Sequence, residues 1–194
     1  MNQEATMHTF ATPGPTNLRV ELGTGECHVR AEQTDTTTVE LVPTHGDSQA
    51  QELIDRSTVE QRGDQVAVLV PKGKSSLFGR KGEVTASIVV PTGSAIDVQL
   101  GSADLDTHGV LGRAKVTAGS GDVSLDEVAD AEVKTGSGDV RIVTATGSVS
   151  AKGGSAEIEI GRVGGRFDFL TGSGDVIVDE AAGPIRGKSG SGDV

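Results

Sequence analysis

The chain has 194 residues and a formal net charge of −11, and its length fits one large or two small domains. The negative charge disfavours nucleic acid as a partner, because phosphate binding needs clustered lysine and arginine. Tryptophan and tyrosine are absent and phenylalanine occurs only four times, so the aromatic faces on which sugar-cleaving grooves commonly depend are scarce.

The start of the chain gives no sequence signal for export. Residues 1–6 lack apolar periodicity, and we expect them to lie outside the folded body, with Met7 as the initiating residue. No stretch before Pro15 has the apolar core of a signal peptide, and none in the chain is long and apolar enough to span a membrane. The sequence therefore predicts a cytoplasmic protein, with association at the cell envelope as the alternative.

Residues 1–100 are predicted to form an irregular β-rich region that caps the repeats that follow. Apolar and polar residues alternate there in short runs, the pattern of strands with one buried face. The runs are Leu18-Val20-Leu22, Val39-Leu41, Val66-Val68-Val70, Val84-Ala86-Ile88-Val90 and Ile96-Val98-Leu100. One short helix is expected over residues 49–56, because Ser48 and Gln51 have capping-box spacing.

Cys27 is the only cysteine, so the chain has no disulfide framework. It alternates with Val29 in a strand-like run and is predicted to be a buried structural thiol. The residues leading to it, 23–27, look like a decayed copy of the turn that recurs later in the chain.

Residues 71–82 form a basic segment in this acidic chain. Its charged and apolar members are Lys72, Lys74, Leu77, Phe78, Arg80 and Lys81. One interpretation is a solvated hairpin loop, since loops tolerate such sequences. The other is a docking loop for an anionic surface or partner, with the two apolar side chains as its anchor. Four charges give such a loop only a marginal attraction to a membrane.

The pentapeptide Gly-Ser-Gly-Asp-Val starts at residues 119, 136, 172 and 190, and degenerate copies start at 101 and 154. The starts are 18 residues apart, with one step of 17. A fixed period of this kind is typical of stacked repeat architectures. Residues 101–194 are therefore predicted to form a solenoid whose last coil is incomplete.

Each repeat contains two pairs of apolar positions, and neither pair can be buried within one repeat. Stacking successive coils buries them in aliphatic columns, with backbone hydrogen bonds between coils. The expected inward-pointing residues are Val123, Leu125, Val133, Val140, Ile142, Ile158, Ile160, Phe169 and Val176. A further column is expected to contain Val110 beside Val128.

The predicted fold is all-β: a right-handed parallel β-solenoid with two strands in each 18-residue coil. The right hand follows from the general preference of parallel crossovers. A left-handed hexapeptide helix needs an aliphatic residue every six, and the series from Val123 fails at Thr135. A calcium-binding nonapeptide roll is a weak alternative, since the glycine–aspartate group recurs every 18 residues rather than every nine.

The fourth position of every repeat is acidic, so stacking predicts a column of carboxylates. The column comprises Asp104, Asp122, Asp139, Glu157, Asp175 and Asp193. These residues either accept backbone N–H bonds in the turn or form a weak divalent-cation site, for which Ca²⁺ is the candidate. We identify no catalytic, cofactor-binding or clustered metal-binding residues elsewhere.

The repeats, the opening at residues 10–15 followed by 18–21, the loop at 77–80 and the strand end at 90–94 together resemble a known family. It is the bacterial domain-of-unknown-function family labelled "putative adhesin", in its actinobacterial branch. The resemblance implies a β-solenoid without a known catalytic site, and some relatives are associated with cell-envelope stress. Members usually continue through further coils, whereas this chain stops at a Gly-Ser-Gly-Asp-Val copy.

We therefore expect a non-enzymatic, adhesin-like scaffold that contacts an unknown protein or surface ligand. The alternatives are a polymerising cytoskeletal solenoid and, less favoured, a β-helix enzyme of the polysaccharide-lyase type. Because Val194 falls inside a strand, the last coil predicts either further coils or self-association through that end.

Overall fold

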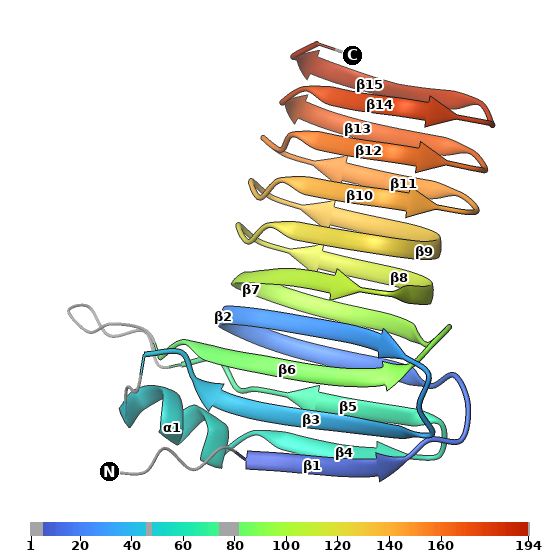
Figure 1. The fold of residues 1–194 in the computed structure, drawn as a ribbon. Helices are drawn as coiled ribbons and strands as arrows, with labels where there is room; N and C mark the ends of the chain where they lie inside the picture. The colour runs from blue at the N-terminus through green and yellow to red at the C-terminus, as the bar shows by residue number, and fades with distance from the viewer. Residues whose placement is uncertain (1–5, 46–47, 74–81, 194) are drawn as a thin grey trace.

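The computed structural model describes residues 6–45, 48–73 and 82–193 (Figure 1). Within these ranges the chain is almost entirely β, with fifteen strands joined in one sheet. The strands up to residue 108 are β1 (Thr6–Ala11), β2 (Asn17–Glu32), β3 (Thr36–Pro43), β4 (Thr58–Arg62), β5 (Gln65–Leu69), β6 (Val84–Pro91) and β7 (Ala95–His108). The later strands are β8 (Val110–Ala118), β9 (Val123–Thr135), β10 (Val140–Ala145), β11 (Val149–Gly153), β12 (Ile158–Val163), β13 (Phe167–Ser173), β14 (Val176–Ala181) and β15 (Ile185–Ser191).

One helix, α1 (Ser48–Asp55), interrupts the strands close to the predicted position. Its apolar face buries Ala50, Leu53 and Ile54, and it contacts β3 and β6. In the described ranges, no helix has the length and apolar character needed to cross a membrane.

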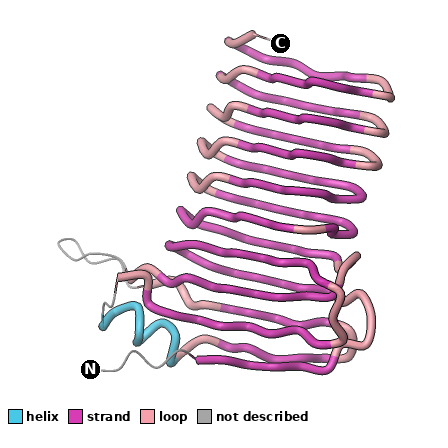
Figure 2. The backbone as a smooth tube through the Cα atoms, viewed as in Figure 1, coloured by secondary structure: helices cyan, strands magenta, loops and turns pink. Residues whose placement is uncertain are grey.

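The sheet folds back on itself to make two layers (Figure 2). One layer, the β10 face, contains β1, β3, β6, β10, β12 and β14. The other, the β13 face, contains β4, β5, β8, β11, β13 and β15. The long strands β2, β7 and β9 contribute one half to each face. The stack is elongated, with β1 and β15 at opposite ends (Figure 1).

From β7 onward the strands pair in parallel, and their register follows the sequence period. On the β10 face, Val123 pairs with Val140, which in turn pairs with Ile158. On the β13 face, Ala131 pairs with Val149, which pairs with Phe167. Equal repeat positions therefore lie side by side in successive coils.

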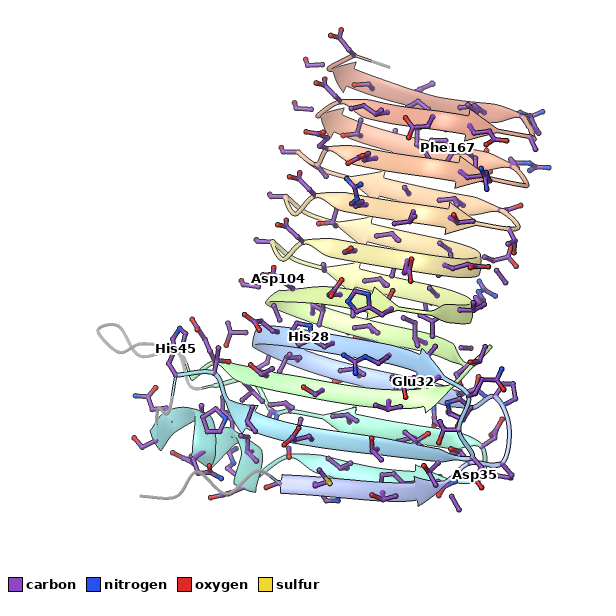
Figure 3. All side chains as sticks on the ribbon, viewed as in Figure 1. His28, Glu32, Asp35, His45, Asp104 and Phe167 are labelled. Atoms are coloured by element: carbon purple, nitrogen blue, oxygen red, sulfur yellow. The ribbon has the colours of Figure 1, made fainter. Side chains whose placement is uncertain are left out.

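The space between the two faces holds the aliphatic core. All nine residues predicted to point inward are buried, so this prediction is confirmed. Phe167, beside the predicted Phe169, is fully buried and its ring centroid lies 5.4 Å from that of Phe169 (Figure 3). Cys27 is also buried, as predicted.

The placement of Val110 beside Val128 is wrong. Leu111 pairs with Val128 and is buried, whereas Val110 is 41% exposed. Pairing between these coils shifts from an 18-residue offset at Asp106 to a 17-residue offset at Val110, so one extra residue is accommodated between them.

Hydrogen bonds from the next coil hold this extra residue. The Gly109 N–H donates to Asp126 Oδ2 at 2.9 Å, and the Asp126 N–H donates to Thr107 Oγ1 at 3.2 Å. Gly109 has a φ of 84°, a left-handed conformation that glycine adopts without steric cost. The extra residue explains why sequence spacing alone misassigned Val110.

The recurring glycines stand where coils approach too closely for a side chain. A Cβ atom on Gly154 would lie 2.5 Å from the carbonyl oxygen of Gly136. The backbone N–H of Ser155 donates to that same oxygen at 3.0 Å. The first glycine of each repeat thus allows one turn to stack on another.

Parallel stacking extends upstream of residue 101, because β2 pairs with β7 from Asn17 to Arg30. Gly25 lies beside Ala103 and Cys27 beside Leu105, which places the suspected decayed turn one coil before the first repeat. The remaining N-terminal strands add the antiparallel pairs β1–β3, β3–β6 and β4–β5. The division of the chain at residue 100 stays a prediction.

Candidate functional site

The predicted acidic column lies on the exposed edge where the β13 face turns into the β10 face (Figure 3). Asp104 Oδ1 accepts the backbone N–H of Asp122 at 2.9 Å, and Asp122 Oδ1 accepts that of Asp139 at 2.9 Å. Asp139 bonds Glu157 in the same way at 3.0 Å, and Asp175 bonds Asp193 at 2.8 Å. Each of these aspartates therefore joins its own coil to the next.

These bonds give the carboxylates a structural role that agrees with the turn interpretation. In the part of the chain that the structure describes, no group of three or more histidine, cysteine or acidic side chains is arranged to hold a metal ion. A cation bound along this column remains only a proposal from the sequence.

Only one member of the predicted docking loop falls within the described residues. Lys72 is exposed and lines a hollow of about 620 Å³ on the β13 face. Lys74, Leu77, Phe78, Arg80 and Lys81 lie outside the described residues, so docking by this loop is untested.

The hollow lies where α1 and β4–β5 meet the first coils. Its floor is apolar, formed by residues such as Leu22, Val70 and Leu100, and two cationic residues, Arg56 and Lys72, lie at its margin. The remaining lining residues are Glu21, Gly23, Thr58, Leu69, Pro71, Gln99, Gly101 and Thr117.

Several of these lining residues belong to one continuous row of neighbouring positions, which we call the axial row. It runs along the stack on the β13 face, crossing one strand at each step. In spatial order the axial row is Thr58, Leu69, Glu21, Gln99, Thr117, Lys134, Lys152, Leu170 and Lys188. The first five residues line the hollow, and the last four form a basic stretch that includes one leucine.

Lys134 binds Glu132 at 2.8 Å, a contact that lowers the pKa of the Glu132 carboxyl. That lowering comes first from the hydrogen bond with Lys134 and then from its positive charge, with smaller contributions from Lys115 and Arg113. Lys134 is thus partly neutralised.

Farther along the stack, the cations of the β13 face are free. Among the described residues, none of Lys152, Arg166, Arg186 or Lys188 has an ion-pair partner, and all four are exposed. The one acidic neighbour among them is Asp168, which is opposite Arg186. On the β10 face, by contrast, Arg141 pairs with Glu159 and Arg162 with Glu180.

A second polar cluster lies on the β10 face beside a hollow of about 400 Å³. His108 Nε2 lies 3.0 Å from Asp106 Oδ2, and His28 Nε2 lies 3.2 Å from Glu26 Oε2. Strand β2 presents His28 next to β7, with Asp106 opposite it in the register (Figure 3). Sequence analysis missed this cluster because its members are about eighty residues apart along the chain.

The axial row was missed for a different reason. Its basic half has a visible sequence signal, since residues 134, 152, 170 and 188 are 18 apart. Its polar half comes from strands that do not repeat, and only the pairing of β4, β5, β2 and β7 brings them into line.

This architecture defines a class of stacked-coil β proteins that display side chains in rows on two sheet faces. The model of the Toastrack DUF4097 family matches residues 16–194, and the chain belongs to this family. The resemblance to a family of unknown function with adhesin-labelled relatives is therefore confirmed. No curated protein sequence matches the chain.

Solved structures with the same fold come from several bacteria. A "putative cell adhesion protein" from Clostridium sporogenes has a TM-score of 0.56 and 13% identity, covering 95% of this chain and all of its own. A "putative adhesin" from Bacteroides fragilis has a TM-score of 0.49 and 13% identity, covering 100% of this chain and 98% of its own. At these identities the likeness concerns the fold.

Proposed function

We propose that the chain is a non-enzymatic interaction module, an adhesin-like scaffold that presents the β13 face to a macromolecular ligand. The observation that supports it best is the axial row, which joins a hollow to a set of unpaired cations on one sheet face. The name of the Clostridium sporogenes protein agrees with this proposal, although the shared property is the fold.

A rigid scaffold is well suited to such a role. The coils are joined by backbone ladders, by the aspartate bonds of the acidic column and by the buried core. Side chains on the outer faces are thereby held in fixed rows, which lowers the entropy lost when a ligand binds several of them. We include in the proposal a right-handed coil, which follows from the preference of parallel crossovers, and membership of the actinobacterial branch.

The test is binding of the purified chain to a panel of immobilised polymers, followed by recovery of each bound polymer and measurement of its length. An interaction module retains at least one polymer and returns it with its length unchanged. Shortened polymer would overturn the proposal in favour of the lyase alternative. Filaments that form from the chain alone, seen by electron microscopy together with an absence of polymer binding, would favour the polymerising alternative.

A further inference from the structure

We infer that the axial row binds a linear acidic polysaccharide laid along the stack of coils. This inference rests on the proposed function, because it names the ligand of the same face. Carboxylates of the sugar acids would meet the lysines, and the hydroxyl groups would meet the polar residues that line the hollow.

The shape of the row suits an extended chain. Neighbouring members lie one strand apart, and the six steps from Glu21 to Lys188 cover roughly 29 Å at about 4.8 Å for each step. The row is one residue wide, and it begins in the hollow of about 620 Å³ that Arg56 and Lys72 border. A long, narrow ligand can therefore contact the whole row at once.

The charges of the row favour an anion. Lys152 and Lys188 are exposed and unpaired among the described residues, and Arg166 and Arg186 lie on the same face. The acidic groups nearby are largely neutralised, since Glu132 pairs with Lys134 and Glu21 with Arg19. Asp168 remains as the one acidic group among these cations.

The uncharged members of the row favour a sugar. Gln99 and Thr117 are exposed neighbours that can donate and accept hydrogen bonds, as recognition of hydroxyl groups requires. Leu170 is 51% exposed between Lys152 and Lys188, where it can contact the C–H face of a sugar ring. Alternating cationic, apolar and amide groups match the mixed surface of a sugar acid polymer.

Other anionic partners fit less well. A flat lipid surface would have to lie close to the exposed acidic column at the edge of the same face, at an electrostatic cost. Single-stranded nucleic acid is usually held by stacking on aromatic side chains, and the axial row contains none.

The test measures binding to polygalacturonate by isothermal titration calorimetry at low and moderate salt. The double variant Lys152→Glu/Lys188→Glu should lose affinity by about tenfold or more and show a flatter dependence on salt. The matched control, Arg141→Glu/Arg162→Glu, changes the net charge equally on the β10 face and should bind like the wild type. Thermal melting of each variant checks that it folds.

A second variant separates sugar recognition from charge alone. Gln99→Ala/Thr117→Ala should weaken binding to polygalacturonate several-fold and leave any binding to polyglutamate unchanged. Equal loss in the two double-charge variants, or tighter binding to phosphatidylserine vesicles, to polyglutamate or to oligo-dT, would overturn the inference. If the wild type binds a neutral polymer or a protein independently of Lys152 and Lys188, the inference fails while the proposed function stands. Shortening of the polymer would instead overturn the proposed function itself.

Discussion

The carboxylate of Asp122 accepts a hydrogen bond from the backbone N–H of Asp139 at 2.9 Å, one coil farther along the stack. Like charges this close repel by roughly 1 kcal/mol in water. A hydrogen bond to a charged group contributes about 1.5–3 kcal/mol, which is enough to offset that repulsion. The balance explains why an acidic residue can recur at the same place in coil after coil.

Replacing Asp139 separates the acceptor from the charge. Asp139→Asn keeps a side-chain oxygen for the N–H of Glu157, so we expect stability equal to or slightly above that of the wild type. Asp139→Ala removes the acceptor and should cost about 0.5–1.5 kcal/mol. Urea denaturation measures both. Equal losses in the two variants would show that the charge, rather than the acceptor, stabilises the turn.

The same variants address calcium. If the column only bridges coils, added Ca²⁺ should leave the melting temperature unchanged in the wild type and in Asp122→Asn/Asp139→Asn. A rise in the wild type that disappears in the double variant would identify a cation site. Calorimetric scans with and without chelator give the answer.

Glu157 is the one acidic member whose carboxylate does not reach the next coil in the described part of the chain. Its side chain is one methylene longer than that of aspartate, and the N–H of Asp175 receives no bond from it. We expect Glu157→Asp to restore the bridge and to stabilise the protein by about 0.5–1 kcal/mol. A decrease in the free energy of unfolding would show that the local turn, which contains Ala156, prevents the bond.

The close approach of turns predicts a large effect from a small substitution. In Gly154→Ala the new Cβ would lie 2.5 Å from the carbonyl oxygen of Gly136, so the stack must shift at a cost of about 1–3 kcal/mol. Gly14→Ala is the matched control, because nothing lies within 4 Å of a Cβ at that position. Chemical denaturation compares them, and similar stabilities would argue against tight turn stacking.

The core predicts a cavity effect at Ile142, which is fully buried between coils. Ile142→Ala should lower the free energy of unfolding by about 2–5 kcal/mol. Its sequence neighbour Val143 is 46% exposed, and Val143→Ala should stay within about 0.5 kcal/mol of the wild type. A small loss at Ile142 would indicate that the coils collapse to fill the space.

Burial raises the pKa of the Cys27 thiol from its ordinary 9.0 to about 12. The folded state therefore favours the protonated thiol. Its contribution to stability is fully present below pH 9.0 and is lost as the pH rises toward about 12. The free energy of unfolding should fall over this range more steeply than in Cys27→Ala, and a thiol reagent should react slowly until the protein is denatured. Rapid labelling of the native protein would show that the thiol is accessible.

The sequence predicted the parts of the fold that repeat. Val123, Val140 and Ile158 occupy one register because their repeats are nearly identical, and the glycine turns mark where each coil closes. It failed at Val110, where an added residue changes the strand register without changing the composition.

The candidate site was harder to predict, since it combines repeated and unrepeated segments. The 18-residue spacing of Lys134 and Lys152 is visible in the sequence, but the hollow beside them depends on how β4 and β5 align with β2. Long-range strand pairing of this kind has no local sequence signal.

The joints between coils have a consequence for the length of the molecule. Each turn offers the next one the same carbonyl and carboxylate acceptors that it binds on the turn before. A unit of 18 residues can therefore be gained or lost between two joints while the remaining side chains stay in phase. The reach of the protein changes in increments of about 4.8 Å, and every added unit lengthens the displayed row by one side chain.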